Sequence, residues 1–250
     1  MIFLPLGIES APTGPKFGGG LQIAANEGIF MNVTDAVLSR RSIRAFSDEP
    51  VSLDVLRRVL DKARMAPSGC NFQPWEATVL TGEPLKALQA KMLASQPQDP
   101  EEYNWSAPMQ SPRHAARLQE LGGLMYGAMG IARDDAAGRQ AFMNQNVTSF
   151  GAPVLLVCYF ERFMESPQWS DVGMWLQTIM LLLREEGLDS CPQEWMGLYA
   201  RLIKDHIGVS DETHLLFCGL SIGKRLDTAV NTFDRPRVAL DEQVKFVGFE

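Results

Sequence analysis

Apolar residues that recur every three or four positions predict helices in several parts of the chain. The clearest case follows Ser52, a favourable N-cap, after which an apolar face continues to Ala63 and the helix is expected to end before Pro67. Thr34 is expected to cap an earlier helix over residues 35–38. Further helices are predicted over residues 118–131 and 136–147, with a short one from Leu85.

The predicted helix over residues 172–186 has an unusual composition. Asp171 or Ser170 is expected to cap it, and from Met174 to Leu183 it is apolar nearly all round. A helix without a polar face must be buried, so this one is expected either in the centre of the domain or in a subunit interface.

Two continuous apolar runs of strand length, residues 154–159 and 215–222, predict strands that are buried on both faces. Residues 75–80 predict another strand, followed by a turn over residues 81–84, and residues 244–249 predict a last one. Helices and strands alternate, but the strands are too few for a doubly wound sheet. The expected fold class is therefore α+β.

Two stretches lack a regular pattern. Residues 1–30 contain three prolines and the run Gly18-Gly19-Gly20, so they are expected to form an N-terminal arm or extension before a single domain over residues 31–250. Four prolines interrupt residues 96–113. Long irregular loops in compact domains are often lids, and an excursion over residues 96–131 is expected to act as one.

Composition and charge narrow the function classes. The 250 residues carry 23 Lys and Arg against 30 Asp and Glu, a net charge of −7, with 46 % hydrophobic and 21 % charged residues. This acidic balance argues against a nucleic-acid partner or an anionic membrane surface, and the proportions are typical of globular proteins. There is no basic signal-peptide start and no apolar run near the ~20 residues that span a bilayer, so the expected location is the cytoplasm.

Common metal, disulfide and enzyme signatures are missing from the sequence. The four cysteines lie far apart without a CxxC pair, which favours small buried hydrophobes in a reducing compartment, and the three histidines offer no zinc-ligand spacing. No dinucleotide fingerprint, P-loop, HExxH or GxSxG motif is present. No metal is therefore expected.

Three polar stretches hold the candidate chemistry. Residues 40–46 read RRSIRAF, residues 66–75 read APSGCNFQPW, and residues 235–237 read RPR. The plain interpretation of each is a solvated arginine face or an ordinary turn. The functional alternative is an anion site, because guanidinium groups bind phosphate oxygens in a bidentate manner. Ser68, Asn71 and Gln73 add donors and acceptors suited to a planar heterocycle.

Taken together, these stretches resemble the FMN-dependent nitroreductase family, from about Asp35 to Glu250. Each motif is weak alone, but their order and spacing together are specific. The resemblance implies a nitroreductase-like α+β fold, with a central, mostly antiparallel sheet surrounded by helices, and an intertwined homodimer with FMN at the subunit interface. The other matching motifs are GAPVLLVCY at 151–159, Gln177, SCPQEW at 190–195, and N…DRPR…LDE between Asn231 and Glu242.

The resemblance also implies how FMN is bound. Arginines at both ends of the domain hold the phosphate and ribityl chain, and Arg44 lies at the pyrimidine edge, where a cation stabilises reduced flavin. Residues 67–71 approach from the partner subunit, and a turn over residues 191–195 crosses the ring with a backbone N–H near Glu194 directed at N5. The implied cofactor-binding residues are Arg40, Arg41, Ser42, Arg44, Pro67, Ser68, Gly69, Asn71, Gln73, Gln177, Cys191, Pro192, Gln193, Glu194, Trp195, Arg235 and Arg237.

The family reaction is a ping-pong transfer of two electrons from NAD(P)H through FMN to an electron-poor acceptor, here a nitroaromatic compound reduced to nitroso, hydroxylamine or amine. No side chain is nominated as an acid, base or nucleophile. The sequence does not choose between NADH and NADPH or identify the natural acceptor. The excursion contains aromatic and methionine side chains that suit a flat apolar acceptor. The alternative is that several of them only pack the lid onto the domain. These side chains, with one histidine, are Tyr103, Trp105, Met109, His114, Met125 and Tyr126.

Alternatives stay open on sequence grounds. The same scaffold could carry a reductive dehalogenase or a flavin-modifying enzyme, but dehalogenation asks for a lysine on the lid and none lies between Met92 and Val147. A non-enzymatic flavin-binding protein would bind FMN without oxidising NAD(P)H. A protein without flavin would leave the arginines as surface charge, and Arg237→Ala would then have almost no effect.

Overall fold

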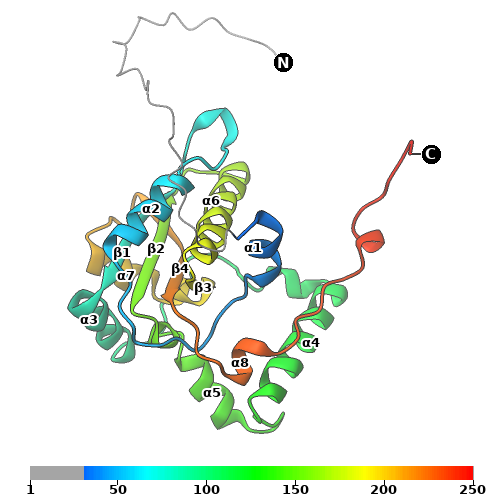
Figure 1. Cartoon of the computed structure of the whole chain (residues 1–250). Helices are drawn as coiled ribbons and strands as arrows, with labels where there is room; N and C mark the ends of the chain where they lie inside the picture. The colour runs from blue at the N-terminus through cyan, green and yellow to red at the C-terminus, as the bar shows by residue number, and fades with distance from the viewer. Residues whose placement is uncertain (1–30, 250) are drawn as a thin grey trace, which may run out of the picture. The chain divides into compact units, whose positions relative to one another are not determined.

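A four-stranded antiparallel sheet lies at the centre of the computed structural model, which describes residues 31–249 (Figure 1). The arm expected over residues 1–30 lies outside the described residues. The strands are hydrogen-bonded in the order β1-β2-β4-β3. Their bounds are Glu76–Thr81 for β1, Val154–Glu161 for β2, Asp189–Gln193 for β3 and His214–Gly223 for β4.

Helices and short 3-10 turns surround this sheet, which confirms the expected α+β class. The helices are α1 (Val33–Ser39), α2 (Leu53–Ala63), α3 (Gly82–Leu93), α4 (Pro112–Ala128), α5 (Ala136–Asn144), α6 (Ser166–Glu185), α7 (Ala200–Ile207) and α8 (Ala229–Thr232). The 3-10 turns are η1 (Gly69–Asn71), η2 (Ala107–Gln110), η3 (Ser149–Gly151), η4 (Glu194–Tyr199) and η5 (Leu240–Glu242). No helix within residues 31–249 is long and apolar enough to cross a membrane.

The strand β2 separates the two halves of the core. Its residues from Val154 to Phe160 are all buried, because β1 and β4 flank it and helices cover both faces. Leu156 and Cys158 pack with α2 and α6, whereas Leu155 and Val157 pack with α3 and α7. The two apolar runs therefore mark inner strands, as predicted. Because successive side chains of a strand point to opposite faces, those of β2 alternate between the two halves of the core.

The start of α1 differs from the expectation. The Asn32 side chain accepts a hydrogen bond from the Asp35 N–H at 2.9 Å, so Asn32 is the N-cap and Thr34 lies inside the helix. Both residues favour caps by the same mechanism. The two neighbouring candidates compete, and the side chain that reaches the N–H groups of the first turn fixes the boundary.

The long helix α6 also begins earlier than expected, at Ser166 instead of residue 172. Glu165 and Gln168 form a reciprocal capping box, so Ser170 and Asp171 lie inside the helix. Within a single chain the helix is buried on one side only, so the alternative of a subunit interface stays a prediction for its other side. Trp175, Ile179 and Leu183 are buried against the sheet, but Met174 is 40 % exposed.

Four further boundaries need correction. The turn predicted over residues 81–84 is wrong, because α3 begins directly at Gly82, whose φ of 58° lets the chain reverse without a separate loop. The strand predicted over residues 244–249 pairs with nothing in residues 31–249, and this C-terminal segment leaves the body of the domain (Figure 1). Helix α4 begins at Pro112, not 118, and α5 ends at Asn144, not 147.

The strand β3 and the helix α7 are missing from the sequence-based expectations. β3 is a five-residue edge strand with a polar start at Asp189 and a proline at 192, so its apolar pattern is broken. The prediction of a turn over residues 191–195 is therefore wrong for 191–193. α7 has only eight residues, too few for a clear helical period.

Candidate functional site

The stretch RRSIRAF lies along the open edge of β3. Helix α1 ends at Arg40, whose extended φ and ψ redirect the chain. Ser42 and Ser190 then form a parallel bridge, and the Ile43 N–H donates to the Ser190 carbonyl at 3.1 Å. The Ile43 side chain is fully buried, which fixes the segment and leaves the neighbouring Ser42 and Arg44 partly exposed.

Asn231 fastens the C-terminal region to this segment. Its Oδ1 accepts from the Arg44 N–H at 2.8 Å, and its Nδ2 donates to the carbonyls of Ala45 and Leu226 at 2.8 Å each. The side chain is 3 % exposed, so these bonds satisfy a buried amide. Asn231 belongs to the N…DRPR…LDE motif, but nothing in the sequence indicates these bonds.

This arrangement gathers five arginines from the two ends of the domain. The pKa of Arg235 is lowered to about 10 by burial and then by the cations Arg41, Arg40, Arg237 and Arg44. Burial, followed by Arg237, also lowers the pKa of Arg40. These shifts indicate mutually repelling guanidinium groups in a partly desolvated place.

No acidic side chain in residues 31–249 forms an ion pair with any of the five. The guanidinium of Arg41 instead donates to the carbonyls of Thr232 and Phe233 at 3.3 and 3.2 Å, and that of Arg237 donates to Pro236 at 3.0 Å. A cluster of cations without a counter-ion is suited to a multiply charged anion, so these residues fit the phosphate of FMN.

A partly buried ion triad lies next to the end of α1, where the arginine cluster begins. Asp189, at the start of β3, is 2 % exposed and accepts from Arg184 Nη1 and Arg225 Nε, each at 2.7 Å. The hydrogen bond to Asp189 raises the pKa of Arg225. Arg184 Nε also donates to Ser39 Oγ at 3.3 Å, which ties the end of α6 to the end of α1. Sequence reasoning missed this triad, because its members are isolated charges in α6, in β3 and in the segment after β4.

The predicted residues of 191–195 divide between the interior and the surface. Cys191 is buried, and burial raises the pKa of its thiol to about 11 although Arg44 acts in the opposite direction. Gln193 is also buried: its Nε2 donates to the Asn146 carbonyl at 3.0 Å and its Oε1 accepts from Ser221. Pro192 and Glu194 are exposed. A ligand over this segment would therefore meet their outer surface and the backbone.

The stretch over residues 67–73 is an exposed loop far from the arginines. The Gly69 N–H donates to Asp171 Oδ2 at 3.2 Å, near the start of α6. The triad residue Arg184 lies thirteen residues further along the same helix, about 20 Å away at 1.5 Å per residue. One chain therefore does not bring this loop to the arginine cluster, and Gln177 lies between the two on α6. Positive φ angles mark the loop at Cys70, Asn71 and Gln73.

The excursion presents some of its aromatic residues and buries others. Trp105 and Met109 are 49 % and 42 % exposed, and His114 is half-buried. The Tyr126 ring packs edge-to-face with Phe142 at 6.0 Å. Tyr103 does not have the open position expected of a lid side chain, because its hydroxyl donates to the Phe217 carbonyl inside the domain.

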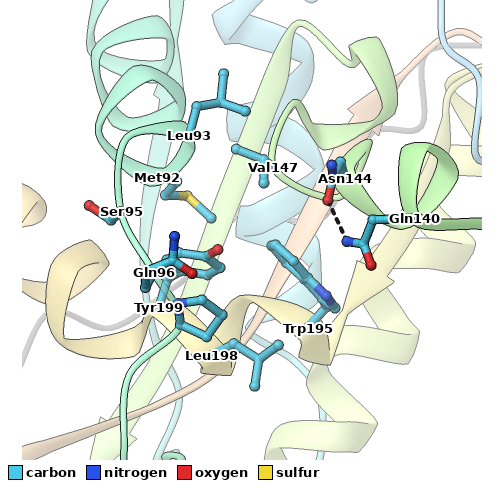
Figure 2. A pocket seen from close by; sticks show the side chains of 11 residues that line it. Met92, Leu93, Ser95, Gln96, Gln140, Asn144, Val147, Trp195, Leu198 and Tyr199 are labelled. Carbon is cyan, nitrogen blue, oxygen red and sulfur yellow. Dashed lines mark hydrogen bonds between the residues drawn. The ribbon is translucent and has the colours of Figure 1, made fainter. Parts of the chain in front are cut away.

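A cavity of about 430 Å³ opens between the start of the excursion, α5 and η4. Figure 2 shows Trp195 and Tyr199 from η4 facing it, with Gln140 donating to Asn144 at its rim. Its lining side chains are all uncharged: Met92, Leu93, Ser95, Gln96, Pro97, Gln140, Asn144, Val147, Trp195, Leu198 and Tyr199. Of the predicted site residues, Trp195 alone lines it.

Comparison with known proteins gives one consistent family. The family model described as "Nitroreductase family" matches residues 37–224. The 4-nitrobenzoate reductase of Pseudomonas putida is 37 % identical over 224 residues, which cover 86 % of this chain and 96 % of that protein. The chloronitrobenzene nitroreductase of Comamonas testosteroni is 32 % identical over 221 residues, covering 86 % and 96 %.

A solved structure agrees with the same family. The crystal structure of the FMN and NADPH-dependent nitroreductase NfnB from Sphigopyxis sp. strain HMH superposes with a TM-score of 0.83 at 42 % identity, covering 88 % of this chain and all of that one. The expected nitroreductase-like fold is thereby confirmed. Since the family model spans most of the chain and both relatives exceed 30 % identity over nearly their full length, this protein belongs to the nitroreductase family.

Proposed function

We propose that this protein is an FMN-dependent oxidoreductase that uses NAD(P)H to reduce nitroaromatic compounds. The observation that carries the proposal is the cluster of five arginines without a carboxylate partner in residues 31–249, on a nitroreductase fold. FMN, when bound, supplies the two-electron chemistry, accepting hydride from the nicotinamide and passing electrons to the acceptor. The side chains of this chain bind and orient the reactants.

The arginines divide into two roles in this proposal. Arg40, Arg235 and Arg237, with the Ser42 hydroxyl, bind the phosphate and ribityl chain, because their guanidinium groups hold no competing carboxylate among the described residues. Arg44 lies beside β3, where its charge acts to lower the pKa of the Cys191 thiol. We assign it to the pyrimidine edge of the flavin. Arg41 is already committed to two carbonyls of the α8 end, so we assign it mainly to holding that end in place.

A homodimer completes the site. The loop over residues 67–73 is bound to α6 at Asp171, whereas Arg184, next to the arginine-bearing segment, lies about 20 Å further along that helix, so the loop can contact the same flavin only from a second copy. The surface between the two regions supports pairing, because Val33 and Leu38 of α1 are 76 % and 75 % exposed and Met174 of the neighbouring α6 is exposed too. Large uncovered apolar patches mark interaction sites. The C-terminal segment adds Phe246 and Phe249, also exposed.

The acceptor is assigned to the surface formed by the exposed backbone at Pro192 and Glu194 and by the excursion. Trp105 and Met109 provide flat and adaptable apolar contacts that suit an aromatic ring. The related enzymes are named for nitrobenzoate and chloronitrobenzene, which supports a nitroaromatic substrate over dehalogenation. We propose NADPH as one electron donor, because the similar NfnB is described as NADPH-dependent.

Anaerobic stopped-flow spectroscopy of the purified protein tests this function. We expect visible flavin absorbance that bleaches on mixing with NADPH or NADH and returns on mixing with 4-nitrobenzoate. Bound flavin that neither nicotinamide bleaches would identify a non-enzymatic flavin-binding protein. A colourless protein that takes up no added FMN would overturn the proposal altogether.

A further inference from the structure

The strand β4 contains one residue more than its neighbour β2 can pair. Cys158 pairs with Cys218 but Tyr159 pairs with Leu216, so Phe217 has no partner on β2. On its other side β4 pairs with β3 only as far as Gln193 and Gly219. A β-bulge leaves backbone polar groups outside the ladder, and buried groups of this kind need other partners.

Two consecutive residues of the excursion supply these partners. Glu102 Oε1 accepts from the Leu216 N–H at 3.1 Å, on one side of the bulge. The Tyr103 hydroxyl donates to the carbonyl of Phe217, the bulged residue itself. The irregular segment is thereby bound to the sheet at one defined place, whereas Trp105 shortly after it is exposed.

A buried ion pair holds Glu102 in this position. Its carboxylate is 3 % exposed and lies 2.8 Å from Lys204 Nζ, whose side chain is fully buried in α7. Arg162 Nη2 approaches the same oxygen at 3.0 Å. Lys204 also donates to the His214 carbonyl at 2.9 Å, so α7, β4 and the excursion share one network.

Tyr103 extends this anchor to the end of β3. Its hydroxyl lies 3.4 Å from the carbonyl oxygen of Glu194, the first residue beyond the β3–β4 ladder. Its ring packs against Gly197 of η4, where a Cβ atom would lie 3.5 Å away, and edge-to-face with Trp169 at 5.6 Å. Burial raises the pKa of Tyr103, so the hydroxyl remains a donor.

We propose that Tyr103 is a positioning residue that fixes the junction of β3 and η4 at Glu194 relative to the root of the excursion. The inference rests on the proposed function in one respect: that function places the acceptor at Pro192 and Glu194, beside the flavin ring that the family resemblance implies over residues 191–195. The bulge makes this contact possible, because it leaves the Phe217 carbonyl outside the ladder, free to accept the hydrogen bond from Tyr103. Without the hydroxyl, the carbonyls of Glu194 and Phe217 lose the hydrogen-bond donor that they share. The backbone at the junction then becomes freer to move.

Comparison of Tyr103→Phe with Tyr159→Phe tests the proposal. Tyr159 is a matched control, because its partly buried hydroxyl lies 3.2 Å from Thr78 Oγ1 on β1, at the opposite edge of the sheet from β3. Each variant keeps the aromatic ring and loses one hydrogen-bonding hydroxyl. In flavin-free protein, we expect hydrogen–deuterium exchange of the amides of residues 194–198 to be about 3- to 10-fold faster in Tyr103→Phe than in Tyr159→Phe. Equal exchange in the two variants would overturn the inference.

A second readout uses the flavin-loaded protein. We expect Tyr103→Phe to slow single-turnover flavin reduction by NADPH about 3- to 10-fold with little change in the FMN dissociation constant, which separates positioning from binding. Reduction at the rate of Tyr159→Phe would contradict a positioning role. If the wild-type protein bound no flavin, the proposed function alone would fail, and the exchange comparison would still decide whether Tyr103 holds the junction.

Discussion

Arg235 illustrates what a single residue contributes to the site. It is a cation in a partly buried place surrounded by other cations, which lowers its pKa to about 10. In flavin-free protein this repulsion opposes the folded arrangement, and a bound anion relieves it. Anions that bind the folded state stabilise it by mass action.

We therefore expect inorganic phosphate to raise the melting temperature of the flavin-free protein more than chloride does at equal ionic strength. Arg235→Gln should abolish this difference and weaken FMN binding about 10- to 100-fold, the effect of one charge-assisted contact. Differential scanning fluorimetry and flavin fluorescence titration measure both. Arg133→Gln, at an exposed arginine without an ion pair in residues 31–249, is the control and should behave as wild type. Equal effects of the two substitutions would contradict the anion site.

Asp189 carries a second residue-level prediction. Asp189→Asn leaves Arg184 and Arg225 without their carboxylate in a buried place, so we expect the free energy of unfolding to fall by about 3–5 kcal/mol. Asp61→Asn removes the partner of Arg64 from an exposed pair and should cost less than about 1 kcal/mol. Urea unfolding followed by circular dichroism compares them. A loss for Asp189→Asn as small as that of the control would show that the triad contributes little.

Elements meet closely where the 40–46 segment crosses the end of β4. A Cβ atom at Gly223 would lie 2.8 Å from Pro153 Cδ and 3.2 Å from Phe46 Cδ1. Gly223→Ala must therefore displace Pro153, and it also crowds the Phe46 ring of the segment that carries the first arginines. Because overpacking typically costs about 1–3 kcal/mol, we expect that loss of stability together with weaker FMN binding.

Urea unfolding and FMN titration measure both effects of Gly223→Ala. Gly122→Ala is the matched control, because Gly122 lies in α4 with no atom within 4 Å of the added Cβ. It should leave FMN binding unchanged and stabilise the helix by about 0.5–1 kcal/mol. Unchanged FMN binding in Gly223→Ala would mean that the packing of β4 does not position the segment.

At the scale of the whole molecule, the proposed function requires a second copy of the chain, because one chain separates the two halves of the proposed site. Met174→Glu places a charge on the exposed side of α6 beside α1, and we expect it to convert the dimer into a monomer that no longer retains FMN. Light scattering after size-exclusion chromatography measures the mass. Phe163→Glu changes an equally apolar side chain, 70 % exposed in the turn between β2 and α6, and should leave both mass and flavin unchanged. A monomeric wild-type protein that binds FMN would contradict the dimer proposal.

The sequence by itself determined the elements whose signal is local. Ser52 marks the start of α2, because its side-chain oxygen can reach an N–H of the first turn in any context. The apolar runs of β2 and β4 mark inner strands, because a continuous apolar segment of that length must be covered on both faces. The ordered motifs, from RRSIRAF to RPR, identified the family. All of these are properties of neighbouring residues along the chain.

Tertiary structure alone decided the features that depend on contacts between distant segments. The Asp189 triad joins α6, β3 and the segment that follows β4. Asn231 binds a segment almost two hundred residues away, and the bulge at Phe217 receives Glu102 and Tyr103 from the excursion. A single charge or amide in a sequence carries no sign of its partner. The strand β3 could not be predicted from the sequence for the same reason. It is an edge strand interrupted by a proline, so its pairing with β4 stabilises it, and it lacks an apolar pattern that would reveal it.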